Sequence, residues 1–155
     1  MTTINLNSAC IQAIDISPAR IAIERALPTI SEDPIRFEIL FPREPEDPRE
    51  LSEVPEIRLW FIRLDIDYPW LPYVLDWKGG ELTRYAAMLV PHSFSKAEGI
   101  EFNPEALQIF VMQKVFVIHS WLKQHDQNRT NNWSKLQQMS QALGYEIDKS
   151  FFELI

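Results

Sequence analysis

The chain has 155 residues, of which 46% are hydrophobic and 24% are charged. A chain of this length buries roughly 70% of its surface on folding, so it needs no disulfide or metal to hold a core. The composition excludes a disordered or collagen-like chain, and the net charge of -7 argues against nucleic-acid binding, which needs clustered lysine and arginine. We therefore expect one globular domain over residues 1–155.

Three features of the sequence indicate a cytoplasmic protein. The single cysteine, Cys10, can form no internal disulfide and cannot by itself hold an iron-sulfur cluster or a structural zinc. No stretch approaches the roughly 18 apolar residues that cross a bilayer. Residues 1–7 contain neither the basic nor the apolar part of an export signal. We expect a reducing compartment and no membrane span.

Short apolar patterns in the first half of the chain predict strands. Residues 10–16 are rich in isoleucine and predict the first strand. Ser17 and Pro18 then form a typical helix start, which predicts a helix over residues 19–27. Residues 35–41 alternate between apolar and polar side chains, which predicts a strand with one buried face.

The next apolar segment, residues 57–66, carries large apolar side chains on both sides of a two-residue period. This pattern predicts a second strand, and because both of its faces are apolar we expect it to be central in the sheet.

An acidic segment separates these two predicted strands. Residues 42–56 hold four prolines and six acidic residues, which predicts a solvated loop with at most one helical turn after Asp47 and Pro48. Residues 32–56 contain nine acids and three arginines, so nearly the whole net charge lies there. Such a loop could steer a basic partner or could simply keep the protein soluble. The candidate binding residues are Glu44, Glu46, Asp47 and Glu50.

Helical spacing dominates the second half of the chain. It predicts helices over residues 81–90 and 104–125, the latter capped by Asn103, and a last helix from Ser134 to a stop at Gly144. We therefore predict an α+β fold, with a small, largely antiparallel sheet from the N-terminal half covered on one face by helices from the C-terminal half.

Common catalytic and cofactor motifs are missing from the sequence. The four glycines form neither a dinucleotide-binding nor a P-loop pattern, the histidines lack metalloprotease spacing, and no nucleophile elbow is present. We expect a protein that is not an enzyme and holds no cofactor.

One alternative enzymatic reading depends on three aspartates. Asp65 and Asp67, two residues apart at a predicted strand end, would share a face and could bind a cation together with Asp76, with His92 as acid or base. Solvated or capping carboxylates explain the same residues. Lys114 lies in the apolar stripe of the long predicted helix, where it could form a buried ion pair or extend its ammonium to solvent.

Aromatic residues are concentrated in residues 60–85, which hold seven of the eighteen in the chain. The segment could be part of the core, or it could be displayed as a binding surface, because aromatic side chains anchor interfaces at low entropic cost. For the second reading the candidate residues are Tyr68, Trp70, Tyr73 and Trp77.

The sequence WLPYVLDWKGGELTRYAAMLVPH of residues 70–92, followed by NPEAL at residues 103–107, resembles the chlororespiratory reduction 6 family. The resemblance extends from about Ile11 to the end of the chain. It implies a protein of cyanobacteria or chloroplasts that helps to assemble the peripheral arm of the photosynthetic NAD(P)H dehydrogenase-like complex by acting on its iron-sulfur subunit.

The resemblance also implies an assembly factor rather than a final subunit, located in the cytoplasm or, in a plastid relative, in the stroma. The chain shows no arginine-rich and serine-rich transit extension, so we expect the cyanobacterial form or a mature domain. The resemblance assigns no functional residue, so the candidates above depend on chemistry alone.

Overall fold

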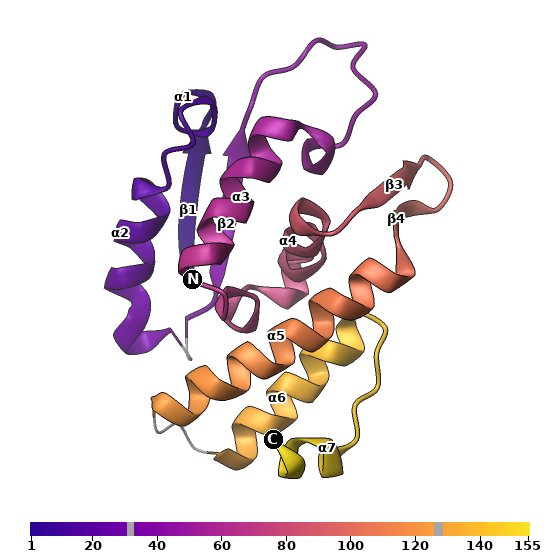
Figure 1. Ribbon diagram of the computed structural model, residues 1–155. Coiled ribbons are helices and arrows are strands. Elements are labelled where there is room, and N and C mark those ends of the chain that lie inside the picture. The colour runs from indigo at the N-terminus through magenta and orange to yellow at the C-terminus, as the bar shows by residue number, and fades with distance from the viewer. Residues whose placement is uncertain (31–32, 126–128) are drawn as a thin grey trace.

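The computed structural model describes residues 1–30, 33–125 and 129–155 (Figure 1). The chain begins with strand β1 (Thr2–Asn7), followed by the short helix α1 (Ser8–Gln12) and by α2 (Ser17–Ala26). Helix α2 confirms the helix predicted over residues 19–27. The strand predicted over residues 10–16 is wrong, because Asn7 accepts a hydrogen bond from the Cys10 backbone N–H at 2.9 Å and so caps a helical turn.

Two small sheets replace the single sheet that the sequence predicts. Strand β2 (Ile35–Leu40) confirms the strand predicted over residues 35–41, but it pairs with β1 in parallel, from Thr2 opposite Ile35 to Asn7 opposite Leu40. An antiparallel hairpin of β3 (His92–Ser95) and β4 (Gly99–Phe102) forms the other sheet and was not predicted. The α+β class is correct, whereas the largely antiparallel arrangement is only partly matched.

Helix α3 (Pro55–Asp67) occupies the segment for which a central strand was predicted, and that prediction is wrong. Ile57, Trp60, Phe61 and Leu64 are buried, and their spacing follows one face of a helix. Figure 1 shows α3 lying across the sheet of β1 and β2. Phe37 of β2 contacts both Trp60 and Phe61 edge to face, with ring centroids 6.2 Å and 5.1 Å apart.

Turns and helix α4 follow α3. The chain passes through the 3₁₀ turns η3 (Leu71–Val74) and η4 (Trp77–Gly79) into α4 (Glu81–Leu89), which confirms the helix predicted over residues 81–90. Two further 3₁₀ turns, η1 (Leu27–Thr29) and η2 (Leu51–Glu53), lie before β2 and before α3. Gly80 joins η4 to α4 with a φ of 74°, a conformation that suits glycine because it has no Cβ.

Three helices complete the chain. Helix α5 (Pro104–Gln124) confirms the long predicted helix, and its cap is the predicted one, because the Asn103 side chain accepts from the Ala106 N–H at 3.1 Å. Helix α6 (Arg129–Ala142) begins before the predicted Ser134, and α7 (Lys149–Leu154) was not predicted.

The buried apolar residues form one contiguous cluster that runs from Ile4 in β1 to Phe152 in α7. Its largest fully buried side chains include Trp60, Tyr85 and Phe37. None of the helices in the described residues is both long enough and apolar enough to cross a membrane.

Candidate functional site

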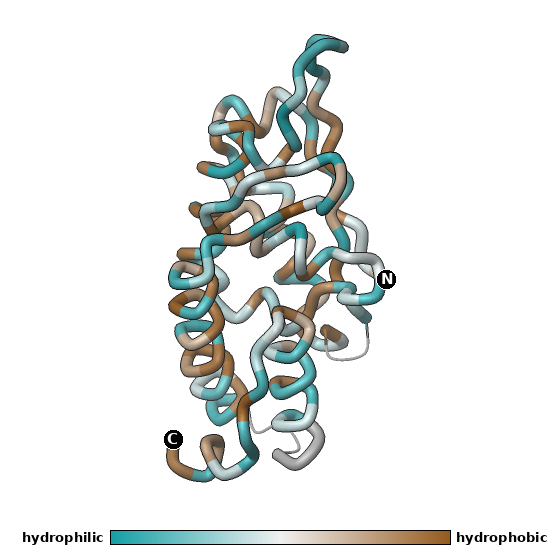
Figure 2. Tube along the Cα trace, turned by 90° about the vertical axis from the view of Figure 1, so that its right-hand side faces the viewer, coloured by the Kyte–Doolittle hydropathy of each residue, from teal (hydrophilic) through white to brown (hydrophobic). Residues whose placement is uncertain are grey.

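The acidic loop, residues 41–50, projects from the body of the molecule between β2 and α3 (Figure 1). It has no regular helix or strand, and Figure 2 shows that the projecting end is hydrophilic. The η2 turn follows the loop and precedes α3. The irregular, exposed part of the predicted loop over residues 42–56 ends at residue 50. Residues 51–53 form the η2 turn, Val54 is buried and α3 begins at Pro55, so the predicted bounds are too wide and the helical turn comes after Glu50 and not directly after Pro48.

Hydrogen bonds within the loop separate its four candidate carboxylates into two kinds. Arg49 binds Asp47 through Nε at 3.0 Å and Nη2 at 2.8 Å, and these bonds lower the pKa of Asp47 to about 2. Glu50 takes part in a reciprocal cap of η2 with Glu53. Glu44 and Glu46 are exposed and form no ion pair with any residue that the structure describes. These two are the carboxylates most available to a partner.

The four aromatic binding candidates differ in how much surface they expose. Trp70 and Tyr73 are only 8% and 3% exposed, whereas Tyr68 and Trp77 are half-buried. Trp70 stacks on Trp121 of α5, with ring centroids 4.5 Å apart and planes 10° apart. Trp70 and Tyr73 therefore belong to the core of the free chain. A role in binding stays a prediction for all four aromatic residues.

Tyr73 connects this segment to α6. Its hydroxyl donates to the Asn132 side-chain oxygen at 3.1 Å, and burial raises the pKa of Tyr73 to about 12. Trp77 is fixed separately, because its indole N–H donates to the Pro72 carbonyl at 2.9 Å. The two rings are thus held in place by hydrogen bonds as well as by packing.

The structure does not bring the three aspartates of the enzymatic alternative together as a metal site. Asp65 and Asp67 lie on helix α3, where a spacing of two residues turns the side chains to different directions. Asp67 accepts from Arg20 at 2.5 Å, and Asp76 caps η4 by accepting from Gly79 at 3.3 Å. No group of three metal-binding side chains occurs within the described ranges. The expectation of a shared face was wrong because it assumed a strand.

Asp65 instead forms a buried ion pair with Lys114. The Lys114 Nζ atom lies 2.6 Å and 2.7 Å from the two carboxylate oxygens, and the Tyr85 hydroxyl donates to the same carboxylate at 2.8 Å. Lys114 is 1% exposed, so its ammonium does not extend to solvent. Burial lowers the pKa of Lys114, and the Asp65 charge opposes that effect. The contact joins helices α3, α4 and α5.

His92, the proposed acid or base of the same alternative, lies in a separate cluster. Its Nε2 atom is 2.8 Å from the Ser52 hydroxyl, and its Nδ1 atom is 3.2 Å from the Val90 carbonyl oxygen. Arg58 donates to the carbonyls of Ser52 and Ala87 beside it. This cluster connects η2, the turn that follows the acidic loop, to the start of β3.

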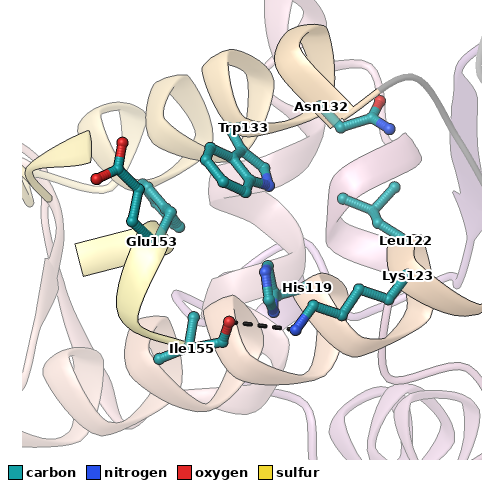
Figure 3. A pocket seen from close by; sticks show the side chains of 8 residues that line it. His119, Leu122, Lys123, Asn132, Trp133, Glu153 and Ile155 are labelled. Atoms are coloured by element: carbon teal, nitrogen blue, oxygen red, sulfur yellow. Dashed lines mark hydrogen bonds between the residues drawn. The ribbon is translucent and has the colours of Figure 1, made fainter. Parts of the chain in front are cut away.

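A small cavity lies between α5, α6 and α7 (Figure 3), with a volume of about 220 Å³. Figure 3 shows Trp133 and His119 projecting toward each other from α6 and α5. Burial and the nearby Lys123 charge lower the pKa of His119, and Lys123 donates to the Ile155 carbonyl at 3.1 Å. The cavity is large enough for one side chain. No sequence pattern indicates this cavity, because its walls come from three helices with separate positions in the chain.

Among these features of the described part of the chain, only the acidic loop can be located from the sequence, because its acidic residues are close together along the chain. The ion pair was one of two readings of Lys114, and its partner Asp65 was assigned to a different role. The Ser52 and His92 contact joins residues forty positions apart, for which no sequence pattern gives a signal.

Comparison with known proteins identifies the family. The model of the chlororespiratory reduction 6 family matches residues 6–154, so the chain belongs to this family. Membership is consistent with a role as an assembly factor for the photosynthetic NAD(P)H dehydrogenase-like complex. No solved structure matches the chain.

Proposed function

We propose that this chain is a non-catalytic assembly factor that binds an immature iron-sulfur subunit of the NAD(P)H dehydrogenase-like complex while the peripheral arm is assembled. The observation that carries the proposal is the family match across residues 6–154. The resemblance of residues 70–92 and 103–107 to the same family implies the iron-sulfur subunit as the partner. The proposed location is the cyanobacterial cytoplasm, or the stroma for a plastid relative.

The acidic loop is the surface that we propose meets the partner first. Glu44 and Glu46 stand exposed on a projecting segment, and long-range charge attraction acts before contact is made. Asp47 and Glu50 would serve mainly to hold the shape of the loop, because each is engaged within it. Tyr68 and Trp77, the two half-buried aromatic candidates, would contact the partner more readily than Trp70 and Tyr73.

Affinity capture combined with deletion tests the proposal. A tagged chain, expressed in a photosynthetic cell that assembles the complex, is expected to retain the iron-sulfur subunit before it joins the peripheral arm. Deletion of the protein is expected to lower the amount of assembled complex and of that subunit. Glu44→Gln combined with Glu46→Gln removes the two exposed carboxylate charges of the loop and tests its part in capture. Glu98→Gln combined with Glu146→Gln removes two exposed charges outside the loop and is the matched control.

Normal accumulation of the complex in the deletion strain would contradict an assembly role. Loss of the complex without capture of the iron-sulfur subunit would contradict only the choice of partner, and the other captured subunits would identify the correct one.

A further inference from the structure

Lys135 of α6 places its ammonium over two aromatic rings of the segment described above. The Nζ atom is 4.3 Å from the ring centroid of Tyr73 and 5.5 Å from that of Trp77. Both rings are fixed by hydrogen bonds, Tyr73 to Asn132 and Trp77 to Pro72. We call the Tyr73 and Trp77 rings the aromatic shelf. The shelf holds the ammonium in a set position without neutralising its charge.

Lys114 provides a comparison for Lys135, because it is a buried ammonium with a structural role in the same chain. Lys114 is paired with Asp65 at 2.6 Å and also lies 5.4 Å from the Phe110 ring centroid. Lys135 has the aromatic contacts but forms no hydrogen bond or ion pair with any residue in the described ranges. Burial lowers the pKa of Lys135, and no acidic group of the described chain offsets that effect. Within the described ranges, no carboxylate lies beside Lys135 as Asp65 lies beside Lys114.

An incoming carboxylate would find this ammonium partly prepared for binding. Lys135 has already lost part of its hydration on folding, so less water remains to be removed when an ion pair forms. Attraction between opposite charges is also stronger where water is partly excluded. The fixed rings restrict the lysine stem, which reduces the entropy lost on binding.

The charge pattern of α6 indicates an acidic polypeptide as the source of that carboxylate. The helix has 14 residues, of which Arg129 and Lys135 are basic and none is acidic, although the whole chain has a net charge of -7. An acidic segment therefore meets no like charge on this helix. The acidic loop of the same molecule does not fill the site, because the loop and α6 lie at opposite ends of the molecule (Figure 1).

We propose that Lys135 on the aromatic shelf is a binding site for a glutamate or aspartate side chain of an acidic polypeptide segment. The site does not depend on the identity of the partner in the proposed function, because it is defined by the chemistry of the ammonium and the two rings.

Nuclear magnetic resonance titration with a capped, glutamate-rich peptide tests the site. The peptide is expected to shift the Trp77 indole N–H signal in a saturable manner, and a peptide with glutamine in place of glutamate is not. Lys135→Met keeps the apolar stem on the rings and is expected to weaken binding about tenfold or more, because the ion pair is lost. Lys135→Arg should largely restore binding. Lys149→Met, at an exposed lysine of α7, is the matched control and should bind like the parent chain.

Three results would overturn the proposal. The glutamate peptide could give no saturable shift, or the glutamine peptide could bind equally well, or Lys135→Met could bind as tightly as the Lys149→Met control. Sodium acetate is titrated in parallel. If acetate matched the peptide in affinity, the site would recognise a free carboxylate and the assignment to a polypeptide would be wrong. An unchanged Trp60 indole signal, from the buried core, shows that each variant is folded.

Discussion

Lys114 and Asp65 differ in how well water could solvate each charge if its partner were removed. The Lys114 side chain is 1% exposed, whereas the Asp65 side chain is 19% exposed. Water can therefore reach the carboxylate when the ammonium is removed, but it cannot readily reach the ammonium when the carboxylate is removed. The two halves of the ion pair should contribute unequally to stability.

We expect Asp65→Asn to lower the free energy of unfolding by about 3–5 kcal/mol, because it leaves the Lys114 ammonium buried without a counter-charge. Lys114→Met should cost less, about 1–3 kcal/mol, since Asp65 keeps the Tyr85 hydroxyl and some contact with water. Urea unfolding of both variants and of the double variant measures the difference. An Asp65→Asn cost equal to or below that of Lys114→Met would show that the ammonium finds another partner.

The buried hydroxyl of Tyr73 makes stability dependent on alkaline pH. Its pKa is about 12 in the folded chain, against about 10 for an unperturbed tyrosine. The folded state thus favours the neutral phenol, so its stability is complete below about pH 10 and declines as the pH rises toward 12. Between these values we expect a loss of about 2–3 kcal/mol from this residue.

The comparison for this prediction is Tyr73→Phe, which cannot ionise. Tyr73→Phe lacks the bond to Asn132 at every pH, so it starts from a lower stability. The gap to the parent chain should narrow and then reverse as the pH rises from 10 toward 12, because the loss from Tyr73 ionisation exceeds the roughly 0.5–1.5 kcal/mol of a hydrogen bond. Tyr85, whose pKa burial also raises, is common to both proteins and cancels. Denaturant unfolding over this pH range gives the gap, and a gap independent of pH would contradict an ionisation at Tyr73.

Helix α3 shows why a period of two can mislead at the level of one element. The segment carries large apolar side chains on both sides of a two-residue period, and several remain exposed, with Leu59 at 51% and Ile66 at 74%. A pattern that is apolar on all sides matches a central strand and a helix equally well. Pro55 in the first turn was the local signal for a helix, since proline is favoured there and interrupts a strand.

The first strand was missed for a different reason. Ile4 and Leu6 of β1 alternate with polar residues, but two apolar positions are too few to indicate a strand by their period. Its parallel pairing with β2 could not be predicted, because no short turn connects the two strands and α1, α2 and η1 lie between them in the sequence. The helix start at Asn103 was predictable because its cap depends on neighbouring residues alone. At α2 the predicted helix is present, but it begins at Ser17 with Ile16 in the cap position and no side-chain cap.

The candidate sites also differ in whether they depend on local sequence or on contacts between distant residues. The acidic loop was predictable because its composition is local. The cavity of Figure 3 and the Lys135 shelf were not, since each joins elements that are distant in sequence.

The stack of Trp70 on Trp121 connects the turn before η3 to α5, and a variant without the Trp70 ring tests the two readings of the aromatic segment. We expect Trp70→Ala to lower the free energy of unfolding by about 3–5 kcal/mol, because it removes a buried ring and its stacking partner contact. Leu59→Ala, at an exposed apolar position, is the control and should change stability little. Wild-type stability of Trp70→Ala together with loss of partner binding would instead identify Trp70 as an interface anchor.

Charge is distributed unevenly over the whole molecule. The acidic loop projects at one end, and α6, which has no acidic residue, lies at the other (Figure 1). Such a molecule can orient a basic surface toward the loop and an acidic one toward α6.

Neutralising the exposed part of the loop should slow association with the proposed partner. With Glu44→Gln and Glu46→Gln together, we expect the association rate to fall about threefold or more at low ionic strength, and the difference to shrink as salt screens the charges. Stopped-flow mixing with the iron-sulfur subunit measures the rate, with the Glu98→Gln and Glu146→Gln chain as control. Equal rates at every salt concentration would leave the loop with a role in solubility only.

The parallel pairing of β1 with β2 also sets an order of events during synthesis. Translation adds about 5–20 residues per second, so β1 leaves the ribosome seconds before the strand that it pairs with. Until Ile35 and the rest of β2 emerge, Ile4 and Leu6 have no neighbouring strand to pair with. The interval between the synthesis of Asp65 and that of Lys114 is longer still. Strand β1 therefore lacks its sheet partner until β2 has been translated, and during that interval its apolar residues are a target for a ribosome-bound chaperone.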